Sequence, residues 1–183
     1  FTRGNKVHMA DGSYKNVEDI VKGDVVKTYG PSKTSQVVCK TKTICEENIE
    51  NIVNIGNLRI TPHHPVVFGV RDVAKKLLSD IWLAGQFSWK FPADLGQINK
   101  IPCEEIYSFV VENRGCMLIE NVICATMGHN LKGEVIGHEY YGTDRVIDDL
   151  KSLPGWNSGE VVITKNMIKR DPNNFKVVSI SMN

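Results

Sequence analysis

The first 127 residues are built from short runs of β-branched and aromatic residues, each closed by a turn signal, and this pattern constrains the fold most. One run covers residues 35–45. A second run, residues 51–61, is interrupted at Gly56-Asn57, a dipeptide that favours a hairpin. Further strands are predicted over residues 104–125, with a turn at 113–115. Because many short strands separated by turns favour a barrel-like or strongly bent sheet, we expect a mainly β body.

The pattern changes at Gly128, where an α/β segment begins. Thr143 is a suitable N-cap for a helix, and Pro154-Gly155 ends it. Four apolar residues line one face of this helix: Val146, Ile147, Leu150 and Leu153. Another short helix is predicted over residues 72–80. We therefore expect a β domain of residues 1–127 and a small α/β extension, residues 128–183, packed on it.

Composition excludes several classes of function. The net charge of +1 provides no field for a polyanion, so neither nucleic acid nor an acidic membrane surface is an expected partner. No apolar run approaches the roughly 18–20 residues that span a bilayer, and the first residues carry no signal-peptide core. We expect a monomer. The cysteines are scattered and odd in number, which predicts reduced thiols rather than a disulfide framework or a zinc site: Cys39, Cys45, Cys103, Cys116 and Cys124.

The segment Thr61-Pro62-His63-His64-Pro65 combines a hydroxyl and two imidazole side chains in one short turn, and is therefore the main candidate for a catalytic site. Its two prolines stiffen the backbone and hold the Thr61 hydroxyl and the His64 imidazole in a fixed relation across one tight turn. Imidazole can donate a proton to a leaving nitrogen near neutral pH. A packed, structural histidine is the alternative interpretation. A shared metal ion is disfavoured, because adjacent residues of a strand point to opposite faces.

The order of motifs along the chain resembles that of Hint domains, the autoprocessing modules of hedgehog proteins and inteins. The opening segment matches at Phe1, Val7, Asp11-Gly12, Val17 to Ile20 and Gly23-Asp24-Val25-Val26. Thr61-x-x-His64 resembles the T-x-x-H motif, and residues 104–130 resemble the closing strands. Residues 125–156 are similar to the extension of the subfamily found with von Willebrand A domains, often called Vint. The resemblance implies a horseshoe-shaped all-β fold.

The resemblance also implies a self-cleaving reaction without a cofactor or a metal. A cysteine expected just before Phe1 would transfer the peptide bond of the upstream polypeptide, held in cis, from nitrogen to sulfur. Thr61 would orient the scissile amide, and His64 would protonate its nitrogen. A second nucleophile (water, a thiol, a sterol or another side chain) would then release the upstream segment, for which a von Willebrand A region is one candidate. A free thiol fits a reducing compartment without requiring one.

The chain as written lacks that first cysteine. It is therefore expected not to perform the first step by itself, and the alternative function is a non-catalytic module for interaction or for linking other domains.

Further residues match the family's site less closely. Cys116 stands where a histidine is common, and Cys124 lies near the position of a cysteine in hedgehog-type domains. Each has the alternative of a small packed residue. Asp94 falls where those domains place an acidic residue for the second step, with a surface turn as its alternative.

His129-Asn130 resembles the pair that ends an intein. Leu131 follows in place of a nucleophile, so ligation is not expected. Asn130 is then a turn residue, whereas His129 remains a candidate for the site.

Overall fold

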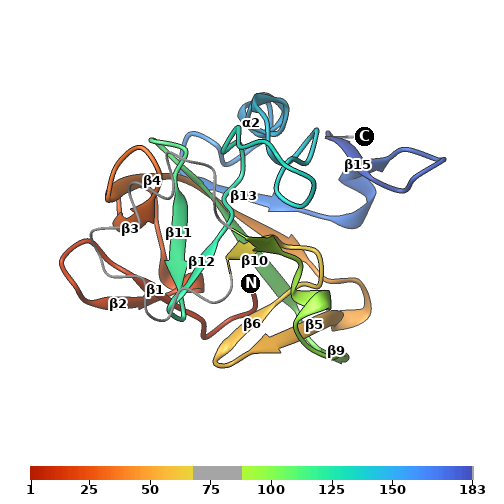
Figure 1. Ribbon diagram of the computed structural model, residues 1–183. Helices are drawn as coiled ribbons and strands as arrows, with labels where there is room; N and C mark the ends of the chain where they lie inside the picture. Colours follow the sequence, from red (N-terminus) through yellow and green to blue (C-terminus); the bar gives the residue numbers. More distant parts are fainter. Residues whose placement is uncertain (68–87, 183) are drawn as a thin grey trace.

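The computed structural model describes residues 1–67 and 88–182 of the chain (Figure 1). The helix predicted over residues 72–80 lies outside the described residues. The described part is mainly β, as the sequence predicts.

One large sheet contains most of the described strands. Its central order is β10-β4-β3-β11-β12-β7-β8, with β1 beside β11, β2 beside β1 and β13 beside β4. Except for the parallel pairing of β13 with β4, these neighbours run antiparallel. The strands are β1 (Lys6–His8), β2 (Tyr14–Asn16), β3 (Val25–Tyr29), β4 (Thr34–Ile44), β7 (Val66–Val67), β8 (Trp89–Lys90), β10 (Glu105–Val111), β11 (Cys116–Ile119), β12 (Val122–Cys124) and β13 (Glu160–Ile163).

A second sheet has the order β6-β5-β9. The hairpin of β5 and β6 turns at Gly56-Asn57, where Gly56 has φ 61°, so the predicted hairpin is confirmed. The strands of this sheet are β5 (Ile49–Ile55), β6 (Leu58–Ile60) and β9 (Ile98–Pro102). Short 3-10 turns join the strands at η1 (Val17–Asp19), η2 (Glu46–Asn48), η3 (Pro92–Asp94) and η4 (Lys165–Met167).

The residues after Gly128 add to the body instead of standing apart from it. Helix α2 (Asp144–Lys151) starts after Thr143, as predicted, although the Thr143 hydroxyl donates back to the carbonyls of Glu139 and Tyr140. Strand β13 extends the large sheet, and β14 (Ile168–Arg170) and β15 (Val177–Ile180) form a separate hairpin. In Figure 1 the helix and this hairpin lie together at one end of the molecule.

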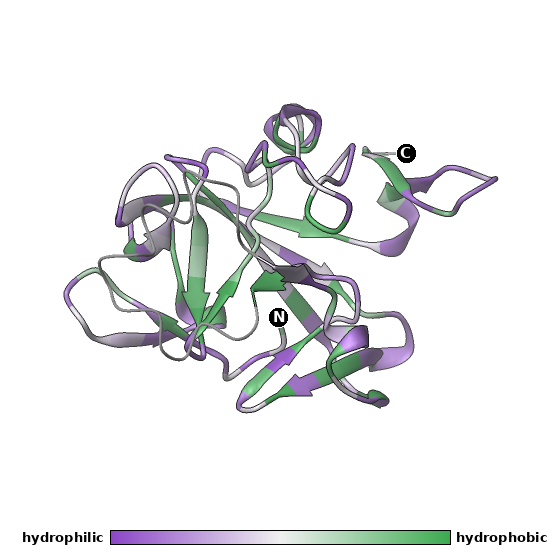
Figure 2. Ribbon diagram, in the orientation of Figure 1, coloured by the Kyte–Doolittle hydropathy of each residue, from purple (hydrophilic) through white to green (hydrophobic). Residues whose placement is uncertain are grey.

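Strand β10 is buried on both faces because the extension covers the side that faces away from the body. Tyr107, Phe109 and Val111 point into the body's core, as the alternation predicts. The intervening Val110 packs with Cys39 and with residues of the extension such as Leu150. Figure 2 shows β10, β11 and β12 as largely hydrophobic and the tip of the β14-β15 hairpin as hydrophilic. The two parts of the chain thus share one strand between two cores.

A buried lysine joins the same parts electrostatically. The Lys40 side chain is 6% exposed, and its Nζ donates to the Glu18 carbonyl at 2.6 Å. The same ammonium pairs with Glu160 of β13 at 2.9 Å and lies 5.5 Å from the centre of the Tyr107 ring. Because a buried charge needs several partners, this arrangement fixes β13 beside β4.

The first residues of the chain lie as an extended segment between β10 and β6. The Phe1 nitrogen donates to the Tyr107 carbonyl at 2.9 Å, and the Tyr107 nitrogen donates to the Phe1 carbonyl at 2.8 Å. The Thr2 nitrogen donates to the Arg59 carbonyl at 3.2 Å. One step further along the same edge of β10, the Phe109 carbonyl accepts the Met127 nitrogen at 2.8 Å.

Asn5 holds this segment against β6, and we expect Asn5→Ala to lower the free energy of unfolding by about 2–4 kcal/mol. Its amide donates to the carbonyls of Thr2 and Arg59 at 2.8 and 2.9 Å and accepts the Arg59 nitrogen at 2.9 Å. Asn5 is 2% exposed, so water cannot replace these bonds. Urea unfolding measures the loss, and Asn51→Ala, at an exposed position of β5, serves as the control. Equal losses in the two variants would contradict the assignment.

Candidate active site

The turn of residues 61–65 is rigid because several backbone contacts fix it. The His64 nitrogen donates to the Thr61 carbonyl at 3.3 Å, and the Ala93 nitrogen donates to the Pro62 carbonyl at 3.0 Å. His63 is exposed and meets the Phe91 ring edge-on, with centroids 5.8 Å apart. The two histidines therefore point to different sides, as adjacency predicts, and His64 is the more buried of the two.

The His64 ring is locked in one orientation and one tautomer. Its Nε2 lies 2.8 Å from the Ala125 carbonyl, and since a carbonyl only accepts, Nε2 carries the proton. In the neutral ring Nδ1 then keeps its lone pair. The Phe1 ring packs against the imidazole at 4.5 Å between centroids, so His64 lies beside the first residue of the chain.

Burial and a neighbouring charge keep His64 neutral. Burial is the larger cause and the N-terminal ammonium the second, and together they lower the pKa of His64 to about 3. If a peptide bond precedes Phe1, the ammonium is replaced by an uncharged amide and its effect is lost, whereas burial, the largest cause, still lowers the pKa of His64. An imidazolium formed here is a strong acid, which suits transfer of a proton to a leaving nitrogen.

Thr61 is only partly buried. Within the described part of the chain its hydroxyl has no hydrogen-bond partner, so the hydroxyl remains available for a bound group. The turn places this hydroxyl three residues before His64, across the same bend.

Cys124 lies with the first residue, whereas Cys116 does not. Cys124 belongs to the core cluster that contains Phe1, and Cys116 belongs to a separate cluster with Val67 and Ile123. Burial raises the pKa of both thiols; for Cys124 the positive N-terminus opposes this rise. The packing of Cys116 favours its interpretation as a small buried residue, and its role in the site stays a prediction.

His129 is buried in the segment that follows β12. Its Nδ1 accepts the Leu131 nitrogen at 2.9 Å, so the neutral ring carries its proton on Nε2. Burial lowers the pKa of His129 to about 4. No described hydrogen bond or ring contact joins His129 to His64, so its role in the site stays a prediction. Asn130, by contrast, is exposed with φ 58°, as a turn residue is.

We expect His129 to make the fold sensitive to acid. Above pH 6.5 its ring is neutral in both states; between pH 6.5 and about 4 only the unfolded chain takes up the proton. Stability therefore falls as the pH falls through this window, by about 2–3 kcal/mol from His129 alone. His129→Asn keeps an acceptor for Leu131 and removes the titration. Urea unfolding of both proteins at pH 7 and pH 4 should show a smaller acid loss in the variant, and equal losses would refute the assignment.

Asp94 lies at the end of η3 and is exposed. Its neighbour Ala93 hydrogen-bonds to the turn of residues 61–65, so Asp94 is near the back of that turn. In the described part of the chain, the Asp94 carboxylate makes no hydrogen bond to Phe1 or His64. Its role in a second step stays a prediction.

The comparison with protein families decides the family of this chain. The family model Vint, described as a Hint-domain, matches residues 1–74 and 80–179. The chain belongs to the Vint family of Hint domains. Hint domains are self-processing modules in general.

A comparison with solved structures adds a distant likeness to this Vint domain. The solution structure of a bacterial intein-like domain from Clostridium thermocellum is 17% identical, with a TM-score of 0.45, and the alignment covers 69% of this chain and 96% of that one. The comparison with curated proteins finds no match. Among the described residues, no helix is long and apolar enough to cross a bilayer, and no cluster of three His, Cys, Asp or Glu side chains could hold a metal ion.

The candidate site also depends on groups that the sequence does not reveal. The carbonyl of Ala125 orients His64, and the backbone of Tyr107 holds Phe1. Backbone atoms leave no residue-type signal, so only the register of the strands could have found them. Cys45 and Cys103 are a second omission: they lie 58 residues apart in sequence and meet in space.

Proposed function

We propose that this Vint domain cleaves the polypeptide that precedes it, by an N–S acyl shift at a cysteine placed directly before Phe1. One observation carries the proposal: the start of the chain lies in contact with the oriented imidazole of His64, at 4.5 Å from the Phe1 ring. A residue before Phe1 is joined to the Phe1 nitrogen, which is buried and paired with Tyr107. The nucleophile is thereby confined to the neighbourhood of His64.

The first step moves one acyl group and one proton. The thiol of the preceding cysteine attacks the carbonyl carbon of its own upstream peptide bond, and the thiol proton passes to Nδ1 of His64. The carbon–nitrogen bond then breaks, His64 returns the proton to the leaving nitrogen, and a thioester and a free amine result. The Thr61 hydroxyl hydrogen-bonds to the scissile group and holds it in place.

Confinement of the thiol beside its amide provides most of the rate enhancement in this proposal. A thiol fixed beside its amide reaches an effective concentration of about 10⁵ M or more. Proton transfer by a positioned imidazole contributes a further factor of about 10²–10⁴. The low pKa of His64 strengthens the imidazolium as an acid at the moment when the nitrogen leaves.

The second step transfers the acyl group to water or to an external thiol and releases the upstream segment. Cys124, in the same cluster as Phe1, is proposed as an internal acceptor that assists this release. The substrate is the upstream polypeptide in cis, and a von Willebrand A region remains the candidate suggested by the family resemblance.

A fusion protein tests the proposed function. An upstream tag is joined through a cysteine to Phe1, and the protein is incubated with dithiothreitol or hydroxylamine. Release of the tag, abolished when that cysteine is replaced by alanine, supports the acyl shift. A fusion that stays intact after long incubation overturns it and leaves a non-catalytic interaction module as the function.

A further inference from the structure

Two thiols outside the proposed catalytic set lie next to each other at the junction of the two sheets. The Cys45 Sγ donates to the Cys103 Sγ at 3.9 Å, and both cysteines are free. Cys45 follows β4, and Cys103 lies between β9 and β10. The pair therefore stands where the chain passes from the large sheet to the small one.

The backbone around the two thiols is tied together on both sides. The Cys45 nitrogen donates to the Glu104 carbonyl at 2.9 Å, and the Cys103 nitrogen donates to the Asn48 carbonyl at 2.8 Å. These bonds bring the two segments side by side independently of the sulfur atoms. A disulfide bond is about 2.05 Å long, so the sulfurs need to approach by roughly 2 Å. Side-chain rotation in a fixed backbone frame can supply such a movement.

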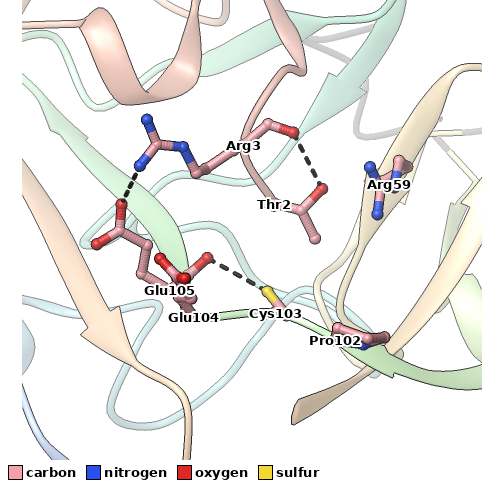
Figure 3. Close-up of a pocket in the computed structure, with 7 residues that line it drawn as sticks. All are labelled: Thr2, Arg3, Arg59, Pro102, Cys103, Glu104 and Glu105. Atoms are coloured by element: carbon pink, nitrogen blue, oxygen red, sulfur yellow. Dashed lines mark hydrogen bonds and ion pairs between the residues drawn. The ribbon is translucent and has the colours of Figure 1, made fainter. Parts of the chain in front are cut away.

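The two thiols differ in access. Cys45 is buried, at 6% exposure, whereas Cys103 is partly exposed and lines a cavity of about 350 Å³. Figure 3 shows the Cys103 sulfur in this cavity beside Thr2 and Glu105, with its hydrogen bond to the Glu105 carbonyl. Cys103 is therefore the thiol of the pair that a small molecule in this cavity can contact.

We propose that Cys103 and Cys45 form a redox-active pair, in which Cys103 takes a low-molecular-weight disulfide and Cys45 resolves the adduct. The proposal rests on the separation of the sulfurs, the paired backbone and the unequal access, and it is independent of the cleavage reaction. The other described cysteines, Cys39, Cys116 and Cys124, are buried and are not part of the pair.

The exchange balances in two steps. Cys103 attacks one sulfur of the reagent, its proton leaves with the first released thiol, and a mixed disulfide forms. Cys45 then attacks the Cys103 sulfur, the bond to the reagent breaks, and a second thiol is released with the Cys45 proton. The dithiol loses two electrons, and the low-molecular-weight disulfide gains them.

The raised pKa of Cys45 makes the resolving step slow at neutral pH and dependent on pH. Burial is the main cause that raises the pKa of Cys45 to about 12, and Cys103 adds to the rise. That second contribution disappears once Cys103 is held in a mixed disulfide. The exchange should accelerate as the pH rises, because the thiolate is the attacking species.

A disulfide bond between Cys45 and Cys103 would constrain the residues that contact the N-terminal segment. Cys103 is two residues from Glu105, whose carboxylate pairs with Arg3 at 3.0 Å, and Thr2 lines the same cavity. A bond to Cys45 fixes this wall of the cavity. We therefore expect the oxidised protein to unfold at a higher temperature than the reduced protein and to lose this gain on reduction.

Oxidised glutathione provides the test. The reduced chain is incubated with it, remaining thiols are alkylated, and the peptides are mapped by mass spectrometry. We expect a Cys45–Cys103 link in the wild type, a stable glutathione adduct on Cys103 in Cys45→Ser, and neither product in Cys103→Ser. Absence of the adduct in Cys45→Ser, or a lasting adduct without the internal link in the wild type, overturns the proposal.

Two controls keep these results interpretable. Circular dichroism establishes that both serine variants fold, and Cys45→Ala replaces Cys45→Ser if the buried hydroxyl unfolds the chain. Cys39→Ser, at a buried thiol outside the pair, should leave the Cys45–Cys103 link unchanged. Failure of tag release in the fusion protein leaves this result untouched, because the readout is the state of the thiols and not cleavage.

Discussion

Replacement of His64 by alanine is expected to slow thioester formation by about 10²–10⁴-fold in a fusion that carries a cysteine before Phe1. The His64 imidazole is held by the Ala125 carbonyl and packs on the Phe1 ring. Alanine at this position keeps neither contact. The loss includes proton transfer and part of the positioning of the first residue. Dithiothreitol-dependent release of the tag, followed over time on gels, measures the rate.

Two variants separate chemistry from folding in this experiment. His63→Ala removes the neighbouring, exposed ring and should leave the rate within about twofold of the wild type, since surface substitutions rarely perturb a fold. His64→Gln retains a donor for the Ala125 carbonyl but cannot carry a proton at neutral pH. Full activity in His64→Gln would show that orientation, not proton transfer, is the contribution of this residue.

The second large effect concerns folding: Gly155→Ala should lower the free energy of unfolding by about 3–5 kcal/mol. Gly155 has φ +94°, and an added Cβ would lie 1.9 Å from the Glu160 carbonyl oxygen. That oxygen belongs to the backbone of β13, so no side-chain rotation can relieve the clash. Displacement of Glu160 also disturbs its ion pair with the buried Lys40.

Gly12→Ala is the matched control for this prediction. Gly12 has a similar φ of +91°, but nothing lies within 4 Å of an added Cβ. Only the backbone penalty of about 1–2 kcal/mol applies there. Chemical denaturation of both variants then isolates the cost of the clash, and losses of equal size would mean that the Gly155 turn yields to the added methyl group.

The sequence predicted those features that depend on local pattern. The hairpin at Gly56-Asn57 and the helix after Thr143 follow from turn chemistry and apolar spacing, and both are present. Adjacency predicts that His63 and His64 face opposite sides, and the T-x-x-H resemblance singles out His64 as the one in the site. These features need only the nearest neighbours along the chain.

Features that depend on distant pairing could not be predicted. A lysine within a strand is ordinarily an exposed residue, yet Lys40 is buried because Glu160 arrives 120 residues later in a parallel strand. The extension likewise covers Val110, which the alternation of β10 would leave facing solvent. Such contacts depend on the topology of the sheet and cannot be predicted from the residue types along the chain.

The end of the ladder along β10 has a consequence for any cargo attached to this domain. An upstream chain that continued the antiparallel pairing of Phe1 with Tyr107 would next need the backbone of Phe109, but that carbonyl already accepts Met127. The cargo must therefore leave the sheet within two residues of Phe1, at the peptide bond proposed to break. We therefore expect a fusion joined through several unstructured residues to be tolerated better than a rigid domain joined directly to this point.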